Sequence, residues 1–290
     1  MAKKNNTAAE LVSGVVRLVS LPEVCIRVNE MLEDPYVSAS DIGKVIGQDT
    51  GLTARLLKIV NSAFYGFPSR IETVTRAVAV IGLRELRGLV LAASAVEAFS
   101  KIPNDVLNMV NFWRHSVYCG LLAQILAERS HVLHSERLFV AGLLHDIGKL
   151  IICNTRPDDY RKVIQSVQKD NRSEHEVERE LFGFDHAEVG GELLKAWKMP
   201  ASLIEAVRFH HDPKAAEVST MEVCLISIAN DLTLIAEHAP DANATDRDIN
   251  DYAWEMIKME ESEIEPAFER AGSMFAEALE SILPRSYYPS

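Results

Sequence analysis

The stretch FVAGLLHDIGKLIIC, residues 139–153, sets the interpretation of the whole sequence. Its apolar residues lie on every side of a helix rather than along one stripe, which is typical of a helix buried all round. His145, Asp146 and Lys149 nevertheless stand in its middle. A buried carboxylate without a partner costs several kcal/mol, so something must neutralise Asp146.

Two interpretations of this segment remain open. Neighbouring residues on a helix point about 100° apart, so His145 and Asp146 can address one centre, with Lys149 one turn further on to hold a phosphate or a substrate oxygen. In the other interpretation, Asp146 and Lys149 form a buried ion pair beside a packed core histidine.

Working outward, nearly every segment has helical periodicity and no alternating strand pattern persists. Ser38 with Asp41 resembles a capping box, and Asp185 can cap the helix that follows it. The sequence predicts long helices over residues 105–129, 136–154 and 220–238, among others. We therefore expect an all-α protein.

The chain divides into three parts. Residues 1–100 predict a small N-terminal helical subdomain, packed on a second helical subdomain over residues 101–240, with acidic helices over residues 241–290. The boundary is expected at Lys101-Ile102-Pro103-Asn104, and the polar stretch 239–248 precedes the final helices.

Composition limits the classes of function. The chain has 290 residues, 48% of them hydrophobic and 25% charged, as in soluble globular proteins. Its 30 Lys and Arg against 42 Asp and Glu give a net charge of −12, which disfavours a nucleic-acid binder that works by bulk positive charge. The first hundred residues are nearly neutral, so the acidity belongs to the rest of the chain.

The cysteines and the apolar runs suggest a compartment. Four dispersed cysteines without a C-x-x-C pair predict reduced, buried thiols. Neither a signal peptide nor an apolar run of about 20 residues, the length that spans a bilayer, is evident. We expect a cytoplasmic protein without a membrane segment.

Further histidines and an aspartate occupy unusual positions. His115 lies on an otherwise apolar helix, and Asp231 shares a helix face with Ile228, Leu234 and Ile235. A buried Asp on such a face needs a cation or several donors. His186 and the pair His210-His211 are weaker signals, because a packed core residue at 115, a surface residue at 186 and an exposed helix end at 210 are the simpler alternatives.

The combination is more informative than its members. Five histidines and two aspartates on separate helices supply the nitrogen and oxygen ligands that bind Fe, Mn, Zn or Ni. No thiolate is near them in sequence, which argues against a structural cysteine-type zinc site. Two metals bridged by one carboxylate would explain an Asp after a His inside a buried helix.

These residues resemble a known family. The pattern H…HD-x-G-K…H…HH…D, together with blocks such as LPEVCIRVNEMLEDP, NSAFYGFP and DHAEVGGELLKAWKMP, is similar to the HDOD branch of the HD superfamily of metal-dependent phosphohydrolases, over residues 15–240. The resemblance implies an HD-type helical domain and about two divalent transition-metal ions per chain, Fe or Mn ahead of Zn or Ni.

The resemblance also implies roles for individual residues. One metal would be held by His115, His145, Asp146 and Asp231. Asp146 would bridge to a second metal held by His186, His210 and His211. Asp146 and Lys149 would be the catalytic residues, with Lys149 on phosphate.

Two departures from related enzymes bear on the reaction. Cyclic-dinucleotide phosphodiesterases of the HD superfamily follow HH with a Glu and a GYP segment, where this chain has Asp212-Pro213. Some also carry a Glu one turn before the first histidine, where this chain has Asn111. Both departures argue against cyclic-di-GMP hydrolysis.

Three functions are therefore open. The first is a bacterial signalling module that keeps a di-metal site and meets a partner protein by association. The second is an active phosphohydrolase on a nucleotide or phosphate ligand. The third is a DNA-binding regulator, based on six basic and two acidic residues within residues 51–90; the alternative there is a packed subdomain whose basic residues are solvated or paired.

Overall fold

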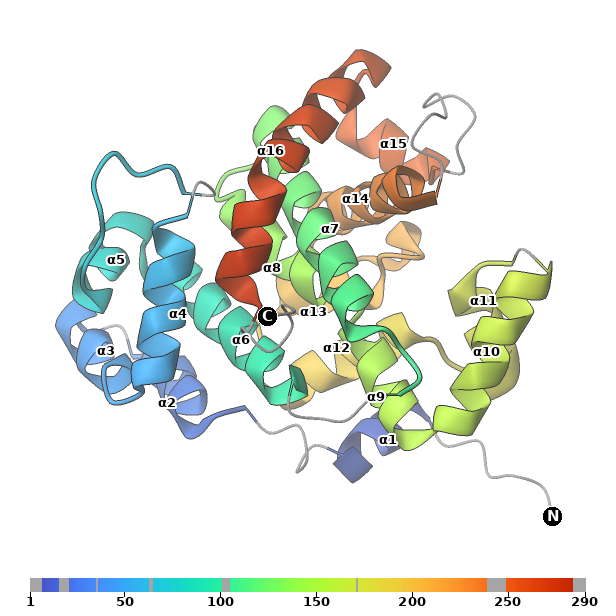
Figure 1. The fold of residues 1–290 in the computed structure, drawn as a ribbon, viewed down its shortest axis with the longest axis horizontal. Helices are drawn as coiled ribbons and strands as arrows, with labels where there is room; N and C mark the ends of the chain where they lie inside the picture. The colour runs from blue at the N-terminus through green and yellow to red at the C-terminus, as the bar shows by residue number, and fades with distance from the viewer. Residues whose placement is uncertain are drawn as a thin grey trace.

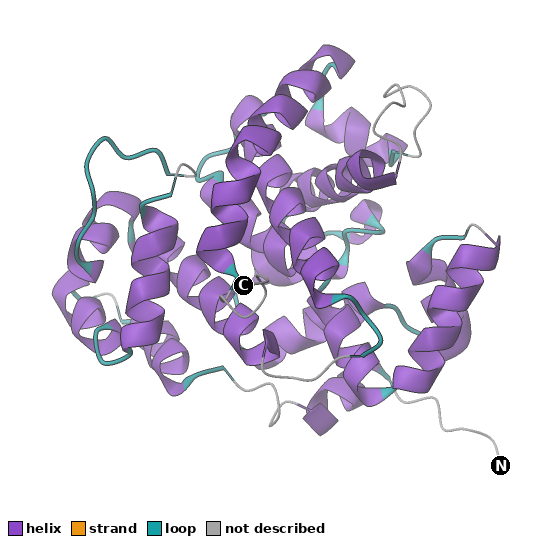
Figure 2. Cartoon of the chain, in the orientation of Figure 1, coloured by secondary structure: helices purple, strands orange, loops and turns teal. Residues whose placement is uncertain are grey.

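The computed structural model describes residues 7–15, 21–34, 36–62, 65–100, 105–170, 172–238 and 249–283. These residues form helices joined by loops and contain no strand (Figures 1 and 2). The all-α prediction is confirmed.

The N-terminal helices form one group at the left of Figure 1. They are α2 (Glu23–Met31), α3 (Ala39–Ile46), α4 (Thr50–Val60), α5 (Val74–Ile81) and α6 (Leu83–Ser100). The capping box of Ser38 and Asp41 opens α3, as predicted, and α6 contacts α2, α4 and α5. The first helix, α1 (Ala8–Val15), instead packs against α9 and α12 of the second group. The expected boundary at residues 101–104 lies outside the described residues.

The second group is built around α7 (Met109–Arg129). The other members of this group are α8 (Glu136–Leu144), α9 (Ile147–Thr155), α10 (Pro157–Asp170), α11 (Glu174–Phe182), α12 (His186–Ala196), α13 (Ala201–Arg208), the 3-10 turn η1 (Pro213–Ala215) and α14 (Thr220–His238). α7 contacts both α8 and α14. A side chain at Gly142 of α8 would lie 2.6 Å from the Cα of Gly120, so this glycine pair lets α7 and α8 approach closely.

The predicted single helix over 136–154 is wrong, because it breaks at the two residues of greatest interest. α8 ends at Leu144 and α9 begins at Ile147, with Asp146 at φ −94 and ψ 5. The turn brings Gly148 so close to α12 that a Cβ there would lie 2.0 Å from the His186 carbonyl oxygen. The break therefore frees the Asp146 side chain from the helix surface and places it beside the start of α12.

The run Glu136–Thr155 is long and apolar enough to cross a membrane by those two measures alone. The expectation that no such run exists was therefore too strong. Of its most apolar window, 83% is buried inside the protein. Such burial is typical of helices in a protein core. All four cysteines are free and buried, as predicted.

The C-terminal helices cover both groups. They are α15 (Asp251–Ile257), the 3-10 turn η3 (Glu261–Glu263) and α16 (Ile264–Ile282). α16 contacts α7 and α4 and lies between them in Figure 1. Lys58 of α4 donates to the Glu280 carbonyl at 2.6 Å, so the acidic C-terminus ties the two groups together. The polar stretch 239–248 lies outside the described residues.

Candidate metal centre

Three donors from α7 and the α8–α9 turn form the first group. His115, His145 and Asp146 each offer a ligand atom, and these atoms all lie within 4.8 Å of one another. His115 Nε2 lies 3.4 Å from His145 Nε2 and 3.7 Å from Asp146 Oδ2. All three residues are buried, at 8%, 0% and 3% exposure. The arrangement favours the ligand interpretation of His115 and His145 over that of isolated core histidines.

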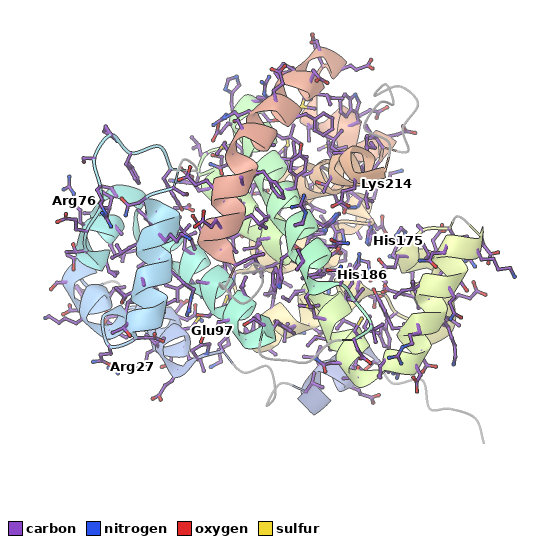
Figure 3. All side chains as sticks on the ribbon, in the orientation of Figure 1. Arg27, Arg76, Glu97, His175, His186 and Lys214 are labelled. Atoms are coloured by element: carbon purple, nitrogen blue, oxygen red, sulfur yellow. The ribbon has the colours of Figure 1, made fainter. Side chains whose placement is uncertain are left out.

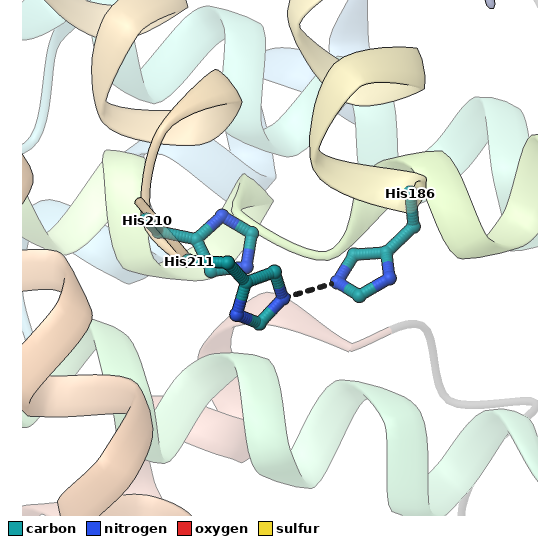
Figure 4. A group of neighbouring side chains, drawn as sticks. All are labelled: His186, His210 and His211. Carbon is teal, nitrogen blue, oxygen red and sulfur yellow. Dashed lines mark hydrogen bonds between the residues drawn. The ribbon is translucent and has the colours of Figure 1, made fainter. Parts of the chain in front are cut away.

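Three histidines form the second group, from the start of α12 and the end of α13. The ligand atoms of His186, His210 and His211 also lie within 4.8 Å of one another. His211 Nε2 lies 2.9 Å from His186 Nε2 (Figure 4). Asp185 caps α12 through the Glu188 N–H, as predicted, and so fixes where His186 begins the helix. His186 and His210 are buried, so the surface and exposed-end alternatives for them are wrong.

Asp146 faces both groups. Its Oδ1 lies 3.0 Å from His186 Nε2 and 3.9 Å from His210 Nε2. Its Oδ2 lies 3.5 Å from His145 Nε2, on the side of the first group. Although Asp146 occupies the N-cap position of α9, its side chain makes no capping hydrogen bond. The carboxylate is thus turned away from its own helix and toward the histidines.

Lys149 partners Asp146 directly. Its ammonium lies 2.7 Å from Asp146 Oδ2 and 2.7 Å from Glu174 Oε2. The Tyr160 hydroxyl donates to the other oxygen of Glu174. The buried ion pair that the sequence left as an alternative is present, and it coexists with the histidine groups rather than replacing them.

Neighbouring groups hold the histidine rings in one tautomer. His145 Nδ1 donates to the Gly142 carbonyl at 2.7 Å, and His210 Nδ1 donates to the Val207 carbonyl at 2.7 Å. Since a carbonyl only accepts, each Nε2 keeps its lone pair. Glu178 Oε2 lies 2.6 Å from His186 Nδ1 and also accepts the His186 backbone N–H. Such outer partners are what orient ligating histidines in metal sites.

Burial and charge set the protonation states of the centre. Burial lowers the pKa of His145 to about 4 and holds the pKa values of His210 and His211 well below the ordinary value, so these imidazoles are neutral. Burial would raise the pKa of Asp146, but the charges of His145, Lys149 and His186 hold it well below the ordinary range. Burial opposes the charged form of His186, yet Glu178 and Asp146 raise its pKa to about 10. The centre therefore offers an ionised carboxylate and neutral nitrogens at His145, His210 and His211, whereas His186 has to lose a proton before it can bind an ion.

Asp231 is not among the donors of either group. It is half-buried on α14, and its Oδ2 accepts the Asn250 N–H at 3.1 Å. Burial raises the pKa of the Cys119 thiol, and Asp146, Asp231 and Glu237 raise it further, so Asp231 lies on the same side of α7 as the centre. The side chain of α14 that contacts His115 Nε2 is Asn230, through its Oδ1 at 3.3 Å.

Several residues of the centre were not predicted from the sequence. They are Glu174, His175 and Glu178 of α11 and Asn230 and Glu237 of α14. The His175 ring stacks on His211 with centroids 4.0 Å apart, and Figure 3 labels it near His186. Glu237 Oε2 lies 3.1 Å from His115 Nδ1. Charged positions on a polar helix such as α11 give no signal of this kind, since most such residues are solvated.

Three of the six basic residues in the stretch 51–90 of the N-terminal group are paired with carboxylates. Arg55 pairs with Glu97, Lys58 with Glu280 at 3.2 Å, and Arg87 with Glu33 at 3.2 Å. These pairs favour the packed-subdomain alternative over DNA contact.

Known proteins are similar to this chain in sequence and in fold. A family model of the HDOD domain matches residues 18–213. A curated relative from Treponema pallidum (strain Nichols), itself an uncharacterized protein, is 28% identical over 225 residues, which is 77% of this chain and 43% of the relative. The chain thus spans less than half the length of that relative.

Two solved structures extend over almost the entire chain. An HDOD domain protein of unknown function from Geobacter sulfurreducens is 27% identical with a TM-score of 0.76, covering 98% of this chain and 97% of its own. A candidate phosphohydrolase from Shewanella amazonensis SB2B is 25% identical with a TM-score of 0.72, covering 96% of this chain and 98% of its own. With a family model that matches most of its length, this chain belongs to the HDOD family.

Proposed function

We propose that this HDOD protein is a bacterial signal-transduction module whose second helical group holds two divalent transition-metal ions bridged by Asp146. The observation that carries the proposal is the placement of one buried carboxylate with an oxygen toward each of two histidine groups. A bridging carboxylate is the usual link of a two-metal site. Membership of the HDOD family supports the signalling role.

The residues present fit such ions. His210 Nε2 is buried and has no hydrogen-bond partner among the described residues, although its ring is fixed by the Val207 carbonyl. An unsatisfied buried nitrogen is costly unless it has a ligand. Neutral imidazoles and an ionised carboxylate suit Fe and Mn as well as Zn and Ni.

The ligand assignment follows the two groups. His115, His145 and Asp146 would hold one ion, with Asp231 as the fourth ligand expected from the sequence. His186, His210 and His211 would hold the other together with Asp146. Glu178 would orient His186 from behind.

A second candidate function is a phosphohydrolase, and Lys149 favours it. Two bound metal ions supply Lewis acidity to a phosphoryl group. Lys149, with 17% of its side chain exposed, could bind a phosphate oxygen beside Asp146, while Glu174 holds its ammonium in place. The Shewanella protein described as a candidate phosphohydrolase has the same fold.

One experiment separates these functions. Purified protein is analysed for metal and then incubated with a panel of cyclic dinucleotides, cyclic mononucleotides and (p)ppGpp, beside the Asp146→Ala variant. Turnover that Asp146→Ala abolishes establishes the phosphohydrolase. Metal without turnover supports the signalling module. Metal-free protein whose stability does not change on adding Fe or Mn contradicts both.

A further inference from the structure

A pocket of about 360 Å³ lies where the two helical groups meet, outside the metal centre. Its walls come from α6, α8 and α13, and α8 contacts both of the other helices. Most of the surface is apolar, from residues that include Gly88, Leu91, Leu138, Ala141, Leu203 and Ala206. Small-molecule sites in proteins have volumes of about 300–1,000 Å³ and mainly apolar walls with a few polar groups.

Of the three arginines that line the pocket, two have ion-pair partners and one has none among the described residues. Arg137 pairs with Glu222 at 2.7 Å, and Arg87 pairs with Glu33 and donates to the Lys198 carbonyl. Arg84, which is exposed at the pocket, makes no ion pair or hydrogen bond with any described residue. One guanidinium is therefore available to a ligand.

The remaining acid does not cancel that charge. Glu85 lines the same wall, and within the described part of the chain it has no ion-pair or hydrogen-bond partner. Burial, and then the nearby Glu136, raise the pKa of Glu85 to about 7. At neutral pH its carboxyl is protonated in a large fraction of molecules and can then donate a hydrogen bond.

We propose that this pocket binds a small organic anion with an apolar body. The body lies against the apolar walls of α8 and α13, and the anionic group lies at Arg84. A guanidinium offers donors in a planar fork that matches a carboxylate or a sulfonate.

The pocket shares two helix ends with the metal centre. Ala141 immediately precedes Gly142, whose carbonyl holds His145. Ala206 immediately precedes Val207, whose carbonyl holds His210. A ligand in this position would suit an effector of the proposed module, but the binding itself does not depend on metal.

The test uses 1-naphthoate, a bulky apolar monoanion, and its neutral analogue 1-naphthamide. Binding to the full chain is measured by isothermal titration, with and without a chelator present. Ser202→Trp fills the pocket from α13, and Ala201→Trp, one residue earlier on the exposed side, is its control. Arg84→Glu reverses the charge at the pocket. Its control, Arg76→Glu, reverses an exposed charge on α5, at the far left of Figure 3.

The expected result is saturable binding of 1-naphthoate, one per chain, in both metal conditions. Ser202→Trp should abolish it, and Arg84→Glu should weaken it about tenfold, whereas the two controls bind as the wild type does. 1-Naphthamide should bind more weakly than the anion. No binding at millimolar 1-naphthoate overturns the proposal, as does binding that Arg84→Glu leaves unchanged. Arg84 is exposed, so its variant folds even if Ser202→Trp does not.

Discussion

The protein contains donor clusters of two kinds, and they differ in their surroundings rather than in their spacing. Glu85, His134 and Glu136 bring their ligand atoms within 4.8 Å of one another, as the two groups of the centre do. His134 is exposed, however, whereas His145 and His210 are buried. Proximity alone therefore does not distinguish a metal site.

The two kinds of cluster differ in how firmly their histidine rings are oriented. His145, His186 and His210 each have one ring nitrogen fixed by a backbone carbonyl or by Glu178. Glu85, His134 and Glu136 are called the outer cluster below. Among the residues described here, no backbone carbonyl or carboxylate is hydrogen-bonded to the His134 ring. A fixed ring keeps its lone pair aimed at one point without further loss of side-chain entropy, so only the buried groups are organised to bind an ion.

The largest expected effect comes from removing the shared carboxylate. Asp146→Ala should reduce the bound metal from about two ions per chain to almost none, because both ions lose a ligand and the charge that attracts them. Elemental analysis of the purified protein measures the number of metal ions per chain. Glu136→Ala removes a carboxylate of the outer cluster and should leave the metal content unchanged. An unchanged content in Asp146→Ala would remove the distinction between the clusters.

Loss of one histidine should have a smaller effect, confined to one ion. His210→Ala should leave about one ion per chain, because the first group keeps His115, His145 and Asp146. The matched variant His134→Ala should retain wild-type content. Equal losses in the two variants would show that the outer cluster also binds metal.

An outer partner should matter less than a ligand. Glu178→Gln weakens the acceptor behind His186, and loss of such a partner typically lowers metal affinity by about 10- to 100-fold. Competition with a chelator measures the affinity. Glu180→Gln changes an exposed carboxylate on the same helix and serves as control. Should both variants match the wild type, the orientation of His186 would not depend on Glu178.

The smallest effect concerns the outer cluster and pH. The pKa of Glu85 rises from 4.5 to about 7 on folding, so its stabilising contribution is present below pH 4.5 and is lost as the pH rises through 7. Glu85→Gln should therefore raise the melting temperature at pH 8 and not at pH 4.5. Solvent screens this half-buried group, so the gain stays below about 1 kcal/mol. A destabilised variant at pH 8 would instead indicate a bound cation at Glu85.

The sequence predicted the helical fold, and it singled out most residues of the candidate centre for identifiable reasons. Periodicity and caps such as Asp185 define helices locally, and buried charges such as Asp146 contradict their apolar surroundings visibly. The break between α8 and α9 was missed, because it depends on the approach of Gly148 to α12, which is a tertiary contact. The same holds for Glu178: its partner lies on another helix.

Asp231 shows the limit of this reasoning. Its apolar neighbours along α14 signal burial, but they do not tell which of two adjacent polar residues reaches His115. In the structure the contact comes from Asn230. Asp231 as a ligand stays a prediction, which the metal content of Asp231→Ala beside Asn230→Ala would decide.

The most direct test of the central claim is the metal content of the wild-type chain, purified without chelator and with oxygen excluded. The two groups around Asp146 predict about two transition-metal ions per chain, and a marked fall in melting temperature when they are removed. A chain isolated without metal, whose melting temperature stays the same when Fe or Mn is added, would contradict the account.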